Sequence, residues 1–503
     1  MSEGYTKARI ILVGCGPHAR RVYLPALRQL RHIELSLVID LESQETAVRN
    51  ATKEIPDTEL WFIRPFADNI PDDVAQKLSS FVIENGVTGV IIATEPLVHK
   101  AYAKWALCNH LSILIDKPIT TRADAATNVA SAEGILDDYT FLLEKYNALQ
   151  LRKETVFMVN SQRRFHKGFQ FVQDKIREVA KATNCPVTFI QAYHCDGQWR
   201  LPNEIVTQEY HPYCFGYGKV SHSGYHILDT VYQLYKASET RDKLADSMEV
   251  VSSFVQPNGF FNQLTEDDYL KIFGKEYEKV NQWSDEQLRQ LCNDFGEIDA
   301  SAIITLKKNE AAIANFNINL LHNGFAGRTW VQPGHDLYKG NGRIKHESYH
   351  IQQGPFQNIQ IHAYQASDKH DEHNGPEDYL GGKNHFDIYV FRNPFVADAV
   401  SQPQVYKLSD ITVNINQAAD SMITMERVKY QVVAEFAAYL TGRLPKAAVQ
   451  SQIDDHFVPV QMMSGMYSSH IRRQNNQSNV IKCALSLEEV VWSGIAPTNS
   501  ELR

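Results

Sequence analysis

Two patterns of hydrophobic and polar positions divide the chain. In the first 160 residues, short runs of consecutive apolar residues alternate with segments of helical period. The runs lie at 9–13, 35–39, 89–93, 112–115 and 156–159. An uninterrupted apolar run of this length is typical of a strand that is buried on both faces. The alternation of such strands with helices predicts a parallel, doubly wound sheet.

The first helix of this region is expected from His18 to about Leu30. Pro25 lies inside it, and a proline within a helix removes one backbone hydrogen bond. We therefore expect the helix to be kinked or short at this point.

The second part of the chain has longer strand-like runs, at 186–194, 299–307, 311–321 and 343–364. Many histidines, glycines and amide residues lie in the window 322–385. This pattern predicts a large, mainly antiparallel sheet with long polar loops. One late helix is expected, because apolar residues repeat at i+4 and two stop signals follow. These residues are Val428, Val432, Phe436 and Leu440, with Gly442 and Pro445 as the stop signals.

The composition is that of a globular protein. The 503 residues carry a formal net charge of −9, and 43% of them are hydrophobic. The acidic balance and the lack of a basic run argue against nucleic acid and anionic membranes as partners. No apolar stretch reaches the roughly 18 residues that a membrane-spanning helix needs. The polar segment before the first strand is not expected to be a signal peptide. Seven scattered cysteines without a CxxC pair favour a reducing compartment, and we expect the cytoplasm.

A glycine motif, Gly14-Cys-Gly16-Pro17-His18-Ala19, follows the first strand and opens the first helix. The first glycine permits a tight turn, and the second lets the backbone approach a pyrophosphate. The free N–H groups at the start of the following helix favour an anion. Asp40 ends the second strand, and its carboxylate can bind both ribose hydroxyls of NAD but would repel the 2′-phosphate of NADP. The motif therefore predicts NAD as the cofactor. In the alternative interpretation the glycines serve packing alone and Asp40 is a solvated strand end.

Two further segments resemble the Gfo/Idh/MocA oxidoreductase family. The first is Ala93-Thr-Glu-Pro-Leu-Val-His99 with Leu114-Ile-Asp-Lys-Pro118, where Asp116 replaces the usual Glu of the family. The second, at 216–229, resembles the family's glycine-rich turn and D-x-G-x-H helix, with His222 in place of the Asp. Weaker echoes lie at 160–165, at 199–200 and at 466–469. The excess length over the family falls at 120–150, 200–215, 250–298 and 366–386.

The resemblance implies a domain organisation and a set of binding residues. It implies a dinucleotide-binding Rossmann domain at 1–160, and a substrate-binding and oligomerisation domain at 161–503 with an α+β fold. For the cofactor it implies Gly14, Gly16, Pro17, His18, Asp40, Thr94, Pro96, His99, Asp116, Lys117, Gln162, Trp199 and Arg200. For the substrate it implies Lys117, Arg164, Lys219, Tyr225 and His226. Gln162, Arg163, Arg164, Trp199 and Arg200 are as readily structural, and Lys219 is as readily a solvated lysine.

Oxidation of a secondary alcohol needs a base for the hydroxyl proton and a hydride acceptor beside the carbon. Lys117 is expected to hydrogen-bond the reacting oxygen and His226 to act as the general acid and base, because an imidazole titrates near neutral pH. The two residues are expected to flank the reacting carbon from opposite domains. His222 is a candidate for orienting His226, although an imidazole cannot replace a carboxylate unless it is neutral and in the right tautomer.

The leading hypothesis is an NAD-dependent dehydrogenase or reductase acting on a sugar, a polyol or a sugar derivative. The alternatives are a glycoside hydrolase or epimerase that uses transient oxidation, and a non-catalytic NAD-binding regulator. The spacing of His222 and His226, and the run His370-Asp-Glu-His373, raise a metal hypothesis. No H-E-x-x-H motif or cysteine ligand supports it, so no metal is expected. The resemblance also implies a homo-oligomer, a dimer or tetramer.

Overall fold

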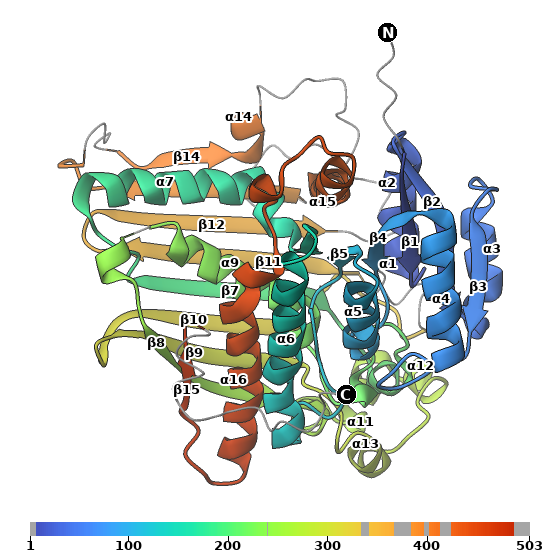
Figure 1. Ribbon diagram of the computed structural model, residues 1–503. Coiled ribbons are helices and arrows are strands. Elements are labelled where there is room, and N and C mark those ends of the chain that lie inside the picture. The colour runs from blue at the N-terminus through green and yellow to red at the C-terminus, as the bar shows by residue number, and fades with distance from the viewer. Residues whose placement is uncertain are drawn as a thin grey trace. The chain divides into compact units, whose positions relative to one another are not determined.

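The computed structural model describes residues 7–238, 240–332, 342–366, 384–396, 402–412 and 424–486 (Figure 1). The chain forms two units, and neither is continuous in sequence. Unit 1 comprises residues 1–122, 134–166 and 415–456, and unit 2 comprises 123–133, 167–414 and 457–503. The division at residue 160 remains a prediction about domains, although the last strand of the first sheet does end at Val159.

Unit 1 contains a six-stranded parallel sheet in the order β3-β2-β1-β4-β5-β6. The strands are β1 (Ala8–Val13), β2 (Ile33–Leu41), β3 (Glu59–Ile63), β4 (Val87–Ile92), β5 (Ser112–Ile115) and β6 (Phe157–Val159). Five of them match the apolar runs of the sequence, which confirms the predicted parallel sheet. The missed strand, β3, lies at the sheet edge and is only partly buried, so it lacks an uninterrupted apolar run.

Helices cover both faces of this sheet. They are α1 (Pro17–Arg21), α2 (Tyr23–Gln29), α3 (Glu45–Thr52), α4 (Asp72–Asn85), α5 (His99–Cys108), α6 (Val129–Gln150) and α15 (Thr424–Leu440). The expected first helix is broken, but at Val22 and not at Pro25. Pro25 lies in the first turn of α2, where a missing N–H costs no helical hydrogen bond.

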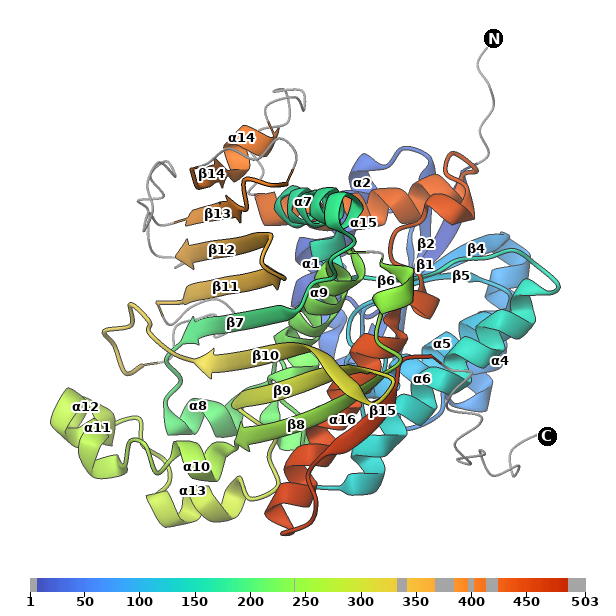
Figure 2. The same ribbon diagram turned by 90° about the vertical axis from the view of Figure 1, so that its left-hand side faces the viewer.

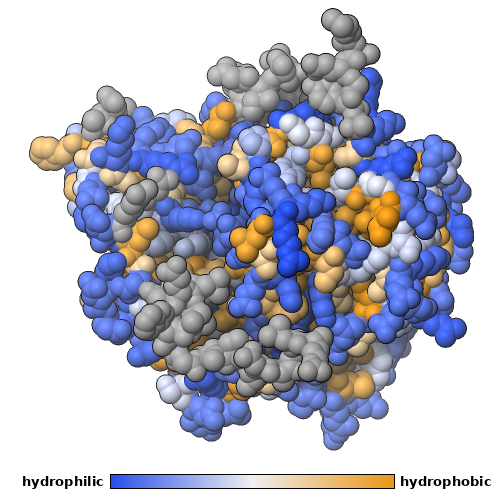
Figure 3. Space-filling model, viewed as in Figure 1, coloured by the Kyte–Doolittle hydropathy of each residue, from blue (hydrophilic) through white to orange (hydrophobic). Residues whose placement is uncertain are grey.

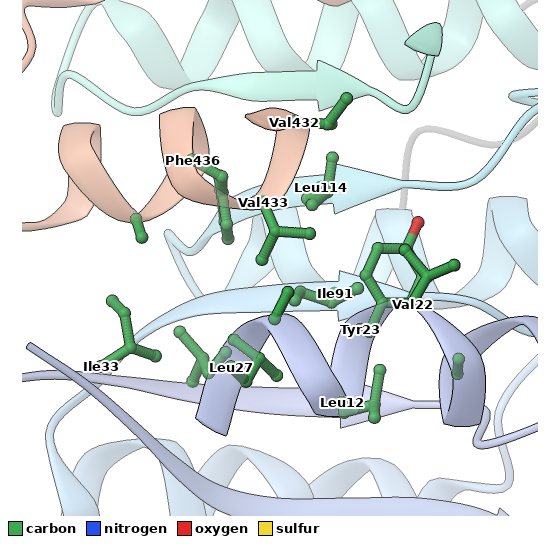
Figure 4. Close-up of a cluster of buried hydrophobic side chains, with 14 of the residues drawn as sticks. Leu12, Val22, Tyr23, Leu27, Ile33, Ile91, Leu114, Val432, Val433 and Phe436 are labelled. Carbon is green, nitrogen blue, oxygen red and sulfur yellow. The ribbon is translucent and has the colours of Figure 1, made fainter. Parts of the chain in front are cut away.

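The late helix α15 packs into the core of unit 1, far in sequence from the strands that it contacts. Figure 4 shows Val433 and Phe436 extending from α15 toward the strand of Ile91, and Val432 belongs to the same cluster. The fit is close at Gly89, where an added Cβ would lie 2.8 Å from a Leu440 methyl carbon and 3.1 Å from the Phe436 ring. The apolar i+4 repeat that predicted this helix is therefore its sheet-facing stripe.

Unit 2 is built on a nine-stranded mixed sheet in the order β14-β13-β12-β11-β7-β10-β9-β8-β15. The strands are β7 (Phe189–Gln198), β8 (Ser247–Val255), β9 (Asp299–Lys308), β10 (Ala311–Asn323), β11 (Ile344–Gln353), β12 (Gln357–Ala366), β13 (Asn384–Arg392), β14 (Gln404–Lys407) and β15 (Ile481–Ala484). Only β7 and β10 pair in parallel, which confirms the expected mainly antiparallel sheet. The run at 343–364 is a hairpin of two strands, because the chain turns at Gly354 with φ +50°.

Three helices lie against one face of the large sheet, namely α7 (Lys167–Thr183), α9 (Tyr225–Lys236) and α16 (Phe457–Gln474) (Figure 2). Smaller helices follow β7 and β8: α8 (Pro202–Thr207), α10 (Pro257–Phe260), α11 (Glu266–Phe273), α12 (Lys275–Glu278) and α13 (Asp285–Leu291); α14 (Leu408–Thr412) follows β14. The segment at 250–298 thus completes β8 and adds short helices. The segment at 366–386 lies almost wholly outside the described residues.

In the described part of the chain, no helix combines the length and apolar character needed to cross a bilayer. Hydrophilic residues dominate the face drawn in Figure 3, with hydrophobic ones in small separate patches.

Truncating the buried ring of α15 should destabilise unit 1. Phe436 is 1% exposed, so Phe436→Ala leaves a cavity between α15 and the sheet. We expect a loss of about 3–5 kcal/mol in the free energy of unfolding, measured by denaturant titration. Phe395→Ala is the matched control, because Phe395 is 96% exposed. Equal stability of the two variants would contradict the packing of α15 described above.

Candidate functional site

The carboxyl ends of β1, β2, β4 and β5 lie at one edge of the parallel sheet, and backbone hydrogen bonds connect the residues that follow them. Gly14 N donates to Ile39 O at 2.8 Å, and Ala93 N donates to Val13 O at 2.8 Å. Further along the sheet, Asp116 N donates to Ile92 O at 2.9 Å. The crevice at the carboxyl ends of such strands, beside the point where the strand order reverses, is where ligands bind in open α/β sheets.

The glycine loop at this edge needs its two glycines for different reasons. Gly14 has φ +85°, and an added Cβ would lie 2.7 Å from Ala93 C and 2.8 Å from Thr94 N. No other residue fits there without moving the end of β4. Gly16 precedes α1, and nothing lies within 4 Å of the place where its Cβ would be. The space beside Gly16 is therefore open, as close approach of a pyrophosphate requires.

Asp40 lies at the end of β2 and is tied to the glycine loop. Its Oδ2 accepts a hydrogen bond from Cys15 N at 2.7 Å, and its Oδ1 accepts one from Leu41 N at 2.7 Å. Burial raises the pKa of the carboxyl, and these two N–H groups oppose the shift. The interpretation of Asp40 as a solvated strand end does not fit these contacts. Burial also raises the pKa of the Cys15 thiol to about 11, so this cysteine is a neutral packing residue.

Asp116, which the resemblance places at a Glu position, is held by two buried side chains. The sequence did not single out Tyr23, and Asn160 begins the weaker echo at 160–165. Its Oδ1 accepts hydrogen bonds from the Tyr23 hydroxyl and from Asn160 Nδ2, the latter at 2.8 Å. Asn160 Nδ2 also donates to the Tyr23 oxygen at 2.7 Å. His18 Nε2 lies 3.9 Å from the same carboxylate oxygen. Burial lowers the pKa of His18 to about 4 although Asp116 opposes the shift, so His18 is neutral at pH 7.

His99 links the end of β4 to the segment after β5. Its Nδ1 lies 2.9 Å from Pro118 O and its Nε2 lies 3.2 Å from Thr94 O. Burial lowers the pKa of His99, and a neutral imidazole has one N–H, so only one of these contacts is a hydrogen bond. The ring thus braces Thr94 against the Lys117–Pro118 peptide, which is cis. Pro96 is buried directly after this strand end.

The residues after β6 are placed mainly by structural contacts. Arg164 is 8% exposed, and its guanidinium pairs with Asp455 at 3.2 Å and donates to Gln450 O. Arg163 is also buried, and Gln162 is half-buried. The structural alternative for Arg164 is supported by these contacts, and its contact with substrate remains a prediction.

In unit 2, the two predicted catalytic histidines lie on consecutive helical segments. A π-helical turn, Val220–Gly224, precedes α9, and Gly224 N donates to Lys219 O at 2.9 Å in the i to i+5 pattern. His222 lies in this turn and His226 in the first turn of α9, with 3% and 8% exposure. Such π turns occur frequently at functional sites. Tyr225 between them is fully buried.

Aromatic rings surround His222, the position at which this chain departs from the family's Asp. His211 stacks on it with ring centroids 4.4 Å apart, and Tyr217 contacts it edge-on at 5.2 Å. Tyr213 lies at 6.4 Å and hydrogen-bonds His322 Nδ1. The environment of His222 is therefore aromatic, whereas the resemblance implied a carboxylate at this position. His211 and Tyr213 were missed because no motif marks them.

The alternative that Lys219 is a solvated lysine is wrong, because its side chain has no exposed surface. Its Nζ lies 2.5 Å from Asp196 Oδ2, 2.9 Å from His194 Nδ1 and 2.9 Å from Ser223 Oγ. Asp196 also pairs with Arg343 at 2.7 Å. Hydrogen-bonded charge pairs of this kind stabilise buried ionic groups. The direct contact of Lys219 with substrate remains a prediction, although three protein groups already surround its ammonium group.

Trp199 and Arg200 follow β7 in unit 2. The Trp199 ring packs on Phe273 with centroids 5.2 Å apart. The backbone carbonyl of Trp199 accepts a hydrogen bond from Arg328 Nη1. Arg200 is 3% exposed and its backbone N donates to Asn323 Oδ1 at 2.8 Å. Both residues thus have structural contacts, and their contact with the cofactor remains a prediction.

Among the residues whose placement is described, no group of three or more His, Cys, Asp or Glu side chains is arranged to hold a metal ion. The run His370–His373 lies outside the described residues.

Sequence reasoning also passed over Glu95, which stands inside the segment that carried the resemblance. It caps the short helix Pro96–Val98, because its Oε2 accepts a hydrogen bond from Leu97 N at 2.7 Å. Burial raises the pKa of the Glu95 carboxyl to about 7. The signal that could have found it is a carboxylate at the variable position between Thr94 and Pro96.

Comparison with solved structures finds similar folds that cover most of the chain. An oxidoreductase from Agrobacterium radiobacter, in complex with NAD⁺, L-tartaric acid and magnesium, is 13% identical with a TM-score of 0.54, and 95% of this chain and 98% of that chain are covered. Aldose–aldose oxidoreductase from Caulobacter crescentus is 12% identical with a TM-score of 0.53, covering 95% and 100%. A 3-ketoreductase from Actinomadura kijaniata in complex with NADP is 11% identical with a TM-score of 0.50, covering 92% and 96%. At these identities the likeness shows the fold.

A search of curated proteins finds no match. A family profile does match: residues 8–134 fit the oxidoreductase family with an NAD-binding Rossmann fold. The matched residues include the glycine loop, Asp40, the Thr94–His99 segment and Asp116–Pro118, which are the groups that the structure brings to one edge of the sheet. By this match residues 8–134 are similar to the NAD-binding Rossmann domain of the Gfo/Idh/MocA oxidoreductase family.

Proposed function

We propose that the protein transfers a hydride between NAD and a secondary alcohol or ketone of a sugar, a polyol or a sugar derivative. The observation that carries this proposal is the set of groups at the carboxyl edge of the parallel sheet, where the open space at Gly16, the carboxylate of Asp40 and the segment ending at Lys117 come together. The substrate class rests on the family resemblance, and two structural neighbours named as acting on an aldose and a keto group support it.

NAD supplies the hydride acceptor at this site, and the side chains supply proton transfer and positioning. Lys117 directly follows Asp116, so its ammonium group is proposed to hydrogen-bond the reacting oxygen. His226 is proposed to take the hydroxyl proton during oxidation and to return it during reduction. The role of His222 is proposed to be orientation, through its place one turn earlier on the same helical path.

The function can be tested directly with the purified protein. Bound nucleotide is released and identified, and a panel of sugars, polyols and nucleotide sugars is screened for NADH formation and for bond cleavage in parallel. NADH formation supports the proposal. Cleavage or epimerisation without net NADH would replace it with transient oxidation, and tight NAD binding without turnover of any compound would favour a regulator.

We also propose that the protein is a homo-oligomer located in the cytoplasm. All seven cysteines are free, which fits a reducing compartment. Along β8 and β9 of the large sheet the side chains alternate between buried and more exposed positions, and Ile303 of β9 is 53% exposed on the side away from the buried residues. A second copy of the chain that packs on this face would remove that apolar surface from water.

The cofactor preference should depend on Asp40. Asp40→Ala should weaken NAD binding by about 10–100-fold, as expected for loss of a charge-assisted hydrogen bond. It should also reduce the difference in affinity between NAD and NADP. Asp40→Asn is the matched control for loop structure, because its amide oxygen can still accept from Cys15 N. Affinities are measured by calorimetric titration. NADP binding as tight as NAD in the wild type would overturn the prediction.

The proposed catalytic groups should affect turnover and leave NAD binding intact. Lys117→Ala and His226→Ala should each lower kcat by about 10²-fold or more, the scale of lost acid–base catalysis. His222→Ala should cost less if His222 only orients its neighbour. Lys104→Ala, at an exposed position of α5, is the control. If His222 proves indispensable and His226 dispensable, the roles assigned here are wrong.

Oligomer formation should depend on the exposed face of the large sheet. Light scattering at micromolar concentration should show a dimer or tetramer for the wild type, and Ile303→Asp should shift it toward smaller species because it places a charge in an apolar contact. Ile83→Asp is the control, since Ile83 is 79% exposed on α4. A strictly monomeric wild type would refute the proposal.

A further inference from the structure

Glu95 is a carboxyl group just after the end of β4 that takes no part in the proton transfer proposed above. Its neighbours fix its place. Ala93 N donates to Val13 O, and Gly14 approaches Ala93 and Thr94 so closely that a Cβ would lie within 2.8 Å of their backbone. Glu95 therefore follows directly on the segment that touches the glycine loop.

The two polar side chains of this segment have hydrogen-bonding capacity that the protein does not use. Glu95 Oε2 accepts from Leu97 N at 2.7 Å, whereas its Oε1 is buried and has no partner among the described residues. Thr94 Oγ1 is likewise buried and without a partner in the described structure. Buried polar atoms without partners are uncommon in native proteins, and each one calls for an explanation such as a ligand. Because Thr94 and Glu95 are adjacent and lie at the ligand-binding edge of the sheet, one bound ligand would account for both atoms.

The order of the strands indicates which part of the dinucleotide lies nearest to Glu95. Asp40 at the end of β2 is suited to the adenosine ribose, and the glycine loop after β1 is suited to the pyrophosphate. The sheet continues from β1 to β4, so the remaining half of the molecule, the nicotinamide nucleoside, extends toward Thr94 and Glu95. That half carries ribose hydroxyls, which donate hydrogen bonds, and in oxidised NAD it carries a positive ring.

We propose that Glu95 is a cofactor-positioning residue whose carboxylate accepts a hydrogen bond from the nicotinamide ribose, so that binding of oxidised NAD releases a proton from this side chain. Without the cofactor, burial raises the pKa of the carboxyl to about 7, and no charged neighbour contributes to that shift. The nearest ionisable group on the following helix is His99, which burial holds neutral. The other charged groups at this edge of the sheet are Asp40 near the end of β2, and Asp116 and Lys117 just after β5.

The direction in which NAD affinity changes with pH follows from the coupling between proton binding and NAD binding. A hydroxyl donor and a positive ring both favour the ionised carboxylate, so the pKa of Glu95 falls when oxidised NAD binds. The affinity for NAD should then rise as pH rises through 7. A one-proton linkage with a free-protein pKa of about 7 predicts a Kd that is about tenfold lower at pH 8 than at pH 6. The inference rests on NAD binding and not on the substrate class proposed above.

The experiment is a calorimetric titration of the full-length protein with oxidised NAD between pH 6 and pH 8. At pH 7 the titration is repeated in buffers of different ionisation enthalpy, which counts the protons exchanged. The wild type should show the tenfold change and release of protons. Glu95→Gln keeps an acceptor for Leu97 N but cannot titrate, so its Kd should vary little with pH. Glu84→Gln, at an exposed position of α4, is the matched control and should behave like the wild type.

Three results would overturn the proposal: a wild-type Kd that does not depend on pH, proton uptake on binding, or a Glu95→Gln variant that keeps the wild-type pH dependence. The wild-type titration and proton count decide the matter even if the variant does not fold. Because no sugar is present, these failures leave the proposed sugar oxidoreduction untouched. Failure of NAD to bind at any pH would overturn both.

Discussion

The close approach of Gly14 to the end of β4 is the contact on which the rest of the site depends. With φ +85° and backbone atoms 2.7 Å from where a Cβ would be, this position excludes every side chain. The contact brings the glycine loop, the end of β2 and the end of β4 into one crevice, because Gly14 N also bonds Ile39 O. This contact also places the residues proposed to bind the cofactor. Asp40 is held by its hydrogen bond from Cys15 N, and Thr94 and Glu95 directly follow Ala93 in the chain.

The ionisable groups around this crevice fall into two kinds. Both oxygens of Asp40 accept from backbone N–H groups, and Oδ1 of Asp116 accepts from Tyr23 and Asn160. Lys219 in unit 2 is similarly enclosed by Asp196, His194 and Ser223. Such groups are held in one orientation. Glu95 differs, because burial raises the pKa of its carboxyl to about 7 and one oxygen lacks a protein partner. A group of this kind can respond to a ligand.

The stability of unit 1 depends on a helix that the chain adds more than 250 residues after the sheet is complete. Helix α15 covers the sheet at Gly89, and its Phe436 and Leu440 occupy the space that a side chain at Gly89 would need. The same unit anchors Arg164 through Asp455, in the segment that follows α15. Unit 1 is therefore not continuous in sequence, because α15 contributes to its core.

Elements whose signal is local could be predicted from the sequence alone. Continuous apolar runs identified β1, β2, β4, β5 and β6 because both faces of a central parallel strand are buried, and Gly14 was identified because a tight turn needs a positive φ. The i+4 repeat identified α15, and the motifs around Asp116 and His226 indicated the family. Three features required the folded structure: the sheet that α15 covers, the contacts of Tyr23 and Asn160 with Asp116, and the burial of Lys219 against Asp196. These are contacts between residues distant in sequence, and such partners leave no periodicity or spacing by which a single sequence can pair them.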